Sequence, residues 1–143
     1  MAEPAAEKGA PAIVAAVAPG EAALPPGYAA HAETLLTVSN RKQRRAAAEA
    51  IASASDEEKQ SIPSYLRNLA WLEKNQSCEA KKLVLDKIEA EGDLRAIPGL
   101  RITAASPRDG CGRGLFSRDC LECMREDLTR VLGRFEALAE KGQ

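Results

Sequence analysis

The chemistry this chain could do centres on its four cysteines. Cys111, Cys120 and Cys123 lie in the segment GCGRGLFSRDCLEC (110–123), and Cys78 is the fourth. Cysteine thiolates can bind Zn²⁺, form disulfides or act as nucleophiles in thiol exchange. These four residues are therefore the candidate site residues, for either a metal ion or disulfides.

A structural zinc site needs four ligands, commonly supplied as two Cys-x-x-Cys pairs. Cys120 and Cys123 provide one such pair, but Cys111 stands alone between two glycines. The second half of a paired motif is missing. Zn²⁺ is nevertheless the one candidate cofactor, and a small structural zinc-binding protein is one alternative reading of the chain.

Three other states of the cysteines remain open. Disulfides between Cys111 and Cys120, or between Cys78 and Cys111, would staple the loop in an oxidising compartment. Reduced cysteines could instead serve as small buried apolar residues. A thiol-redox protein would use Cys120 and Cys123 at a helix start, where a thiol pKa is lowered, although no βαβ pattern precedes the pair.

The elements that must position these cysteines are predicted to be helices. Apolar residues recur at helical spacing from residue 28 onward, and no segment shows the alternation typical of a strand. The sequence therefore predicts an all-α domain of small antiparallel helical hairpins packed as a bundle. Its predicted helices span 28–38, 41–54, a short segment from 56, 64–74, 78–92, 93–105 and 119–142, with Pro98 and Gly99 shortening or kinking the sixth.

This arrangement predicts where the cysteines meet. If 78–90 and 93–105 form an antiparallel hairpin around Gly92, Cys78 lies at the end where residue 105 leaves the hairpin. The segment with Cys111 follows directly. A helix over 119–142 would place Cys120 and Cys123 one turn apart on roughly one face. All four thiols are therefore expected at one pole of the molecule.

Composition limits the classes of function. The 143 residues carry 20 Lys and Arg against 21 Asp and Glu, a net charge of −1, so no general attraction to nucleic acid or anionic membrane is expected. The basic cluster RKQRR (41–45) is interpreted as a solvated helix start. No apolar run is long enough to span a bilayer, and no export signal precedes the helices, so the chain as given is expected in the cytoplasm.

Two domains of different character are predicted. Residues 1–27 are rich in Ala and Pro and are expected to form a disordered linker, because such a segment buries little apolar area. Residues 28–143 form the helical domain. His31 is the only histidine, so no Ser-His-Asp or Cys-His set can be assembled, and no catalytic motif is found. GCGRG lacks the lysine and preceding strand of a phosphate-binding loop, and a flexible corner is the simpler interpretation.

The segments CEAKKLVLDKIEAEGDLRAIPGL (78–100) and GCG…DCLECMREDLTRVLGRFE (110–136) resemble the C-terminal HEAT-like helical region of large bacterial Ser/Thr protein kinases of the myxobacterial type. The shared features are the Gly-Asp-Leu-Arg-Ala hairpin (92–96), the Gly-Cys-Gly turn and the Asp-Cys-x-x-Cys start of the last helix. The kinase motifs themselves are absent. The resemblance implies a non-catalytic interaction or regulatory domain. Its working surface is expected to be a helix-lined groove that binds a helix of a protein partner or a kinase domain. It also implies a periplasmic or extracellular location if the parent protein spans a membrane.

Overall fold

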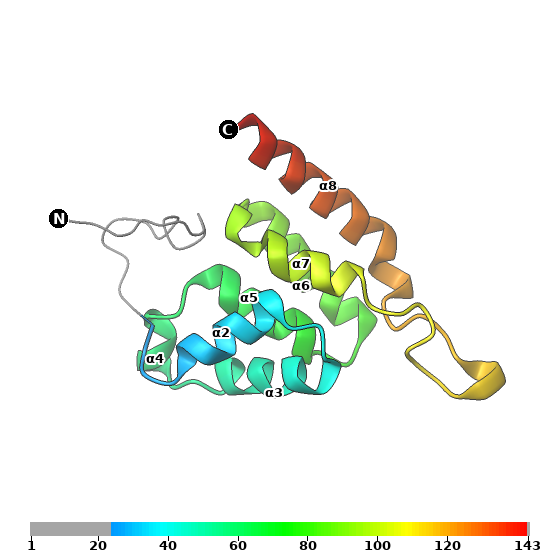
Figure 1. Ribbon diagram of the computed structural model, residues 1–143, viewed down its shortest axis with the longest axis horizontal. Helices are drawn as coiled ribbons and strands as arrows, with labels where there is room; N and C mark the ends of the chain where they lie inside the picture. Colours follow the sequence, from blue (N-terminus) through cyan, green and yellow to red (C-terminus); the bar gives the residue numbers. More distant parts are fainter. Residues whose placement is uncertain (1–23, 143) are drawn as a thin grey trace.

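The computed structural model describes residues 24–142, and among them all regular structure is helical (Figure 1). The prediction of an all-α fold is confirmed. Residues 1–23 of the predicted linker 1–27 lie outside the described residues. The helices are α2 (Tyr28–Thr37), α3 (Arg41–Ala52), α4 (Asp56–Gln60), α5 (Ser64–Lys74), α6 (Cys78–Glu91), α7 (Ile97–Ala104) and α8 (Arg125–Lys141), with 3₁₀ turns η2 (Leu94–Ala96), η3 (Gly114–Phe116) and η4 (Glu122–Met124).

Side chains just outside the helices fix several of their starts. Asn40 and Ser77 accept hydrogen bonds from the amides of Gln43 and Ala80, at the starts of α3 and α6. Ser55 and Glu58 form a reciprocal capping box at the start of α4. These bonds satisfy amides that a helix leaves without a partner. Residues 41, 56 and 78 therefore begin helices for local reasons.

The helices form a bundle around one leucine-rich core. α5 packs against α3 and α6, while α7 packs against α2 and α8. The largest fully buried side chains come from all of these helices except α4, and they include Leu35, Ile51, Leu69, Leu85, Leu100 and Phe135. α7 approaches α2 and α5 closely at Gly99. A Cβ added to this glycine would lie 2.8 Å from a methyl group of Leu69. No helix of the described part combines the length and the apolar character that crossing a membrane requires.

The last helix begins later than its sequence pattern predicts. The sequence pattern predicts one helix over 119–142, but α8 starts at Arg125, after the 3₁₀ turn η4. Cys120 lies in a turn and Cys123 in η4, so the prediction that both start one helix is wrong. The cause is local, because the Asp119 carboxylate accepts bonds from the Leu121 amide and from Arg125, which hold this segment in a turn.

The basic cluster RKQRR is not simply a solvated helix start. Arg44 is only 3% exposed, and its guanidinium lies 3.0 Å from a carboxylate oxygen of Glu73. The same group donates to the carbonyls of Leu35 and Val38, at 2.8 and 3.0 Å. Arg44 thus ties the end of α2 to α5, which corrects the interpretation of this residue. The HEAT-like stacking of hairpins stays a prediction.

Candidate functional site: the disulfide-braced loop

The four cysteines form two disulfides. Cys111 is joined to Cys120, with 5.1 Å between their Cα atoms, and Cys78 is joined to Cys123, with 6.0 Å. The first pairing is one of the two that the sequence suggested, whereas the suggested Cys78–Cys111 pairing is wrong. No cysteine is free among residues 24–142, so the reading of reduced, buried cysteines is also wrong.

The positions of the sulfur atoms bear on the thiol-redox and zinc-site interpretations of the cysteines. Cys120 and Cys123 belong to separate disulfides, so they are not paired with each other as a Cys-x-x-Cys redox centre. Within the described residues, no group of three or more His, Cys, Asp or Glu side chains is arranged to hold a metal ion. The four sulfur atoms are instead used in covalent links between segments.

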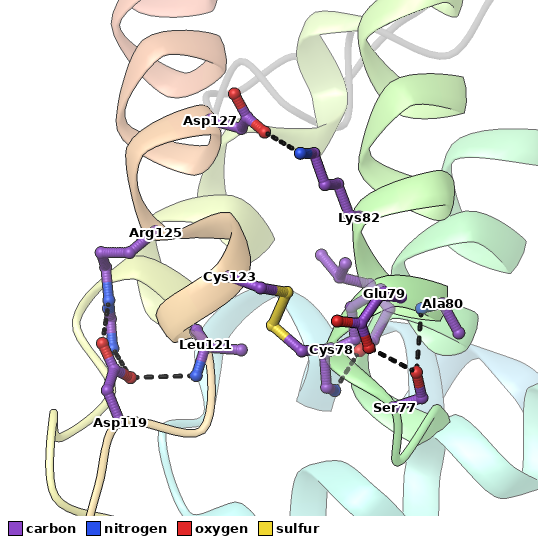
Figure 2. Close-up of a disulfide and its surroundings, with 12 residues drawn as sticks. Ser77, Cys78, Glu79, Ala80, Lys82, Asp119, Leu121, Cys123, Arg125 and Asp127 are labelled. Carbon is purple, nitrogen blue, oxygen red and sulfur yellow. Dashed lines mark hydrogen bonds and ion pairs between the residues drawn. A yellow bond between two sulfur atoms is a disulfide. The ribbon is translucent and has the colours of Figure 1, made fainter.

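The disulfide between Cys78 and Cys123 connects the start of α6 to η4, just before α8 (Figure 2). Ser77 caps α6 and so places Cys78 at its first position. Farther along the same two helices, Lys82 lies 3.5 Å from the Asp127 carboxylate, and Glu89 accepts from Arg130 at 2.7 Å. The turn before α8 is therefore joined to α6 by a covalent bond, and α8 itself is joined to α6 by ion pairs.

A buried ion pair fixes the segment between the two C-terminal cysteines. Arg125 is 8% exposed, and its guanidinium donates two hydrogen bonds to the Asp119 carboxylate, at 2.6 and 2.9 Å (Figure 2). It also donates to the Ala104 carbonyl at 2.9 Å, at the end of α7. The hydrogen bonds from Arg125 hold the pKa of Asp119 below its usual value. One guanidinium thus joins the returning chain to the end of α7.

We call residues 110–120 the cysteine loop. The Cys111–Cys120 disulfide closes its base, and the Cys111 and Arg118 backbones exchange two hydrogen bonds of 2.9 and 2.6 Å just above it. Gly112 turns the chain with a φ of 81°, and a Cβ there would lie 2.2 Å from the Phe116 carbonyl oxygen. GCGRG is therefore one arm of a narrow, covalently closed turn, and only glycine fits at residue 112.

The tip of the cysteine loop presents two large apolar side chains to solvent. Leu115 is 99% exposed and Phe116 is 83% exposed, within the 3₁₀ turn η3. In Figure 1 this segment projects away from the helices. Arg113 and Arg118 flank the pair, and neither forms an ion pair with a carboxylate of the described chain. Sequence reasoning missed this pair, although Leu115 and Phe116 are apolar residues outside any helical stripe.

The geometry supports binding more directly than bond-making. A rigid turn carries two adjacent apolar side chains between two arginines, which is the composition of a contact surface. No protein-family model, curated protein or solved structure matches the chain. The resemblance to kinase C-terminal regions therefore stays a prediction.

Proposed function

We propose that this protein is a non-catalytic interaction module that inserts the tip of the cysteine loop into an apolar pocket of a partner protein. The near-complete exposure of Leu115 and Phe116 is the observation that carries the proposal. Burying each of these side chains would contribute about 1.5–3 kcal/mol. A contact centred on such a pair can supply much of the binding energy of an interface.

The charges beside the tip define the partner further. Arg113 and Arg118 are exposed on either side of Leu115 and Phe116, with no carboxylate of the described chain paired to them. A complementary partner has an apolar pocket rimmed by Asp or Glu side chains. Such rim charges contribute mainly to association rate and orientation, so binding should weaken at high salt.

A protein partner fits these features better than a lipid bilayer. Two apolar side chains supply less membrane affinity than the single acyl chain that already gives only marginal anchoring. The net charge of −1 adds no general attraction to anionic lipid. A shaped protein pocket can enclose both side chains fully, which a lipid surface does not do specifically.

The bonds that hold the cysteine loop lower the conformational entropy that it loses on binding. The disulfide, the paired backbones of Cys111 and Arg118, and the strict glycine at residue 112 hold the turn in one shape before contact. A surface that is already ordered loses less conformational entropy when it binds. The proposal therefore assigns the cysteines a structural role in presenting Leu115 and Phe116.

Site-specific crosslinking tests the proposal. The photoreactive residue p-benzoylphenylalanine is placed at position 116 of the full chain, and covalent products formed in the source cells are identified by mass spectrometry. The captured protein is then purified and titrated calorimetrically. A kinase domain is one partner that this experiment can identify, as the resemblance implies.

The variants Leu115→Ser/Phe116→Ser and Leu83→Ser make a matched comparison. Leu83 is 66% exposed on α6, where it lines a hollow with Trp71 between α5 and α6, and this hollow is the alternative binding surface. The tip variant should weaken binding at least about a hundredfold, from the apolar area lost, while Leu83→Ser leaves it unchanged. Equal binding by the tip variant would reject the proposal. Loss of binding with Leu83→Ser alone would favour the groove between α5 and α6 as the binding site. Cosedimentation with lipid vesicles that depends on the cysteine loop would favour a membrane as the partner.

A further inference from the structure

A cavity of about 640 Å³ lies at the foot of the cysteine loop. It is bounded by the start of α3, the connection between α5 and α6, and the end of α7. Its volume falls in the range of about 300–1,000 Å³ found for small-molecule sites. Leu72, Ile102, Leu121 and the Cys111–Cys120 disulfide contribute apolar surface to its wall, so it can enclose the apolar part of a ligand.

The ionic side chains around this cavity are mostly cationic. Among the described residues that line it, Glu73 supplies the sole carboxylate. The cations are Arg41, Arg44, Arg45, Lys81 and Arg101. Arg44 is already paired with Glu73 at 3.0 Å, and Arg101 is paired with Glu136 at 2.6 Å. The other three cations, Arg41, Arg45 and Lys81, form no ion pair within residues 24–142, and Glu73 acts on Lys81 only from a longer distance.

Lys81 is the most enclosed of these three cations. Its ammonium donates to the carbonyls of Leu72 and Glu73 at the end of α5, at 2.5 and 3.4 Å. Burial lowers its pKa, the Glu73 carboxylate opposes that effect, and the guanidiniums of Arg45 and Arg41 add to it. An anion in the cavity would offset this mutual repulsion of like charges.

The other two cations differ in how firmly they are held. Arg41 donates to the Gly110 carbonyl at 3.3 Å, so it also supports the base of the cysteine loop. Arg45 lies one helical turn along α3 and makes no ion pair with the described chain. Arg45 is therefore the residue whose replacement disturbs the surrounding structure least.

We propose that this cavity binds a small organic anion, a carboxylate or phosphate ester with an apolar body, through Arg41, Arg45 and Lys81. Charge-assisted hydrogen bonds from guanidinium and ammonium groups recognise the anionic oxygens. The apolar wall distinguishes such a ligand from inorganic phosphate. Leu115 and Phe116 do not line the cavity, so this inference does not depend on the function proposed for the loop tip.

A titration of the full chain with phenyl phosphate at low salt tests this inference. Binding is monitored by ¹⁵N–¹H NMR. We expect saturable binding with a dissociation constant of about 1 mM or tighter, with amide shifts concentrated at residues of the cavity wall. Inorganic phosphate should bind more weakly because it lacks the apolar body, and benzyl alcohol should not bind measurably. Equal affinity for inorganic phosphate would overturn the assignment to an organic anion.

The variants Arg45→Gln and Lys42→Gln make the matched comparison. Lys42 is an exposed cation on the same helix and does not line the cavity. Arg45→Gln should weaken phenyl phosphate binding about tenfold or more, Arg45→Lys should retain part of it, and Lys42→Gln should leave it unchanged. Thermal melts verify that each variant is folded. No saturable binding, or equal losses for Arg45→Gln and Lys42→Gln, would overturn the proposal.

Discussion

The helical bundle and the cysteine loop are held together by different forces. In the bundle, leucines such as Leu35, Leu85 and Leu100 are completely buried between helices. Between residues 107 and 118, Cys111 alone is even partly buried. The loop therefore keeps its shape through a disulfide, a pair of backbone hydrogen bonds and the ion pair at its base. It lacks a core of its own.

This difference indicates how the two regions respond to conditions. Apolar burial in the bundle is insensitive to redox state and to moderate changes of pH. The loop depends on the Cys111–Cys120 bond, which a reductant breaks, and on the Asp119 carboxylate, which acid neutralises. A contact surface built in this way can be rigid although it buries almost no apolar area. Its stability then depends on the redox state and pH of the solution.

Removing the disulfide that joins α6 to η4 should have the largest effect on stability. Cys78 and Cys123 are 45 residues apart in sequence, whereas Cys111 and Cys120 are 9 apart. Loop-closure entropy predicts a loss of about 4 kcal/mol for Cys78→Ser/Cys123→Ser and about 2.6 kcal/mol for Cys111→Ser/Cys120→Ser. Chemical denaturation of both double variants measures these losses. A larger loss for the short link would contradict the entropic account.

Leu100→Ala should destabilise the bundle by about 3 kcal/mol, within the usual range for buried leucines, because it leaves a cavity where α7 meets its neighbours. Urea unfolding followed by circular dichroism gives the free energy of unfolding. The control is Leu83→Ala, at a position 66% exposed, which should cost less than about 0.5 kcal/mol. Similar losses at the two positions would show that burial does not dominate the bundle.

Asp119→Asn should lower the free energy of unfolding by about 2 kcal/mol, since it removes the negative charge that Arg125 binds. The pKa of Asp119 is lower in the folded than in the unfolded chain. Its contribution is therefore present above the unfolded pKa of about 3.9 and is lost as pH falls through the folded value. Unfolding measured between about pH 6 and 2 should show a shallower acid loss for Asp119→Asn, and an identical slope would argue against this pair.

Leu115→Ser/Phe116→Ser should change stability least, by less than about 0.5 kcal/mol, because both side chains already face solvent. The same denaturation experiment measures it. This result would separate the proposed binding role of the tip from any role in folding. A clear destabilisation would instead mean that the tip packs against the protein.

Much of the bundle could be predicted from sequence because its causes are local. Stripes at helical spacing marked α2, α3, α5 and α6, and the capping residue Ser77 and the terminating Gly92 lie where the chemistry of helix ends requires them. Gly92 has a φ of 65°, which glycine adopts without strain. The periodic pattern predicts the wrong start for α8, because it does not reveal the turn that the bonds between Asp119 and Arg125 hold.

The site was harder to predict because it depends on contacts between distant segments. Sequence spacing allowed the Cys111–Cys120 link, but Cys78–Cys123 requires the packing of α6 against the turn before α8. The burial of Arg44 likewise depends on Glu73, which is 29 residues away. Leu115 and Phe116 gave no signal of exposure in the sequence, because apolar residues are expected inside a protein.

The covalent closure across the foot of the cysteine loop also governs how the protein would bear a mechanical load. One arm of the loop leads back to α7 and the other leads on to α8. Because the Cys111–Cys120 disulfide bridges the arms, a pull on Phe116 by a bound partner cannot unzip them. The force is instead transmitted to the segments before and after the disulfide, which Arg125 joins through its bonds to Ala104 and Asp119. The ends of α7 and α8 would therefore separate before the tip changes shape.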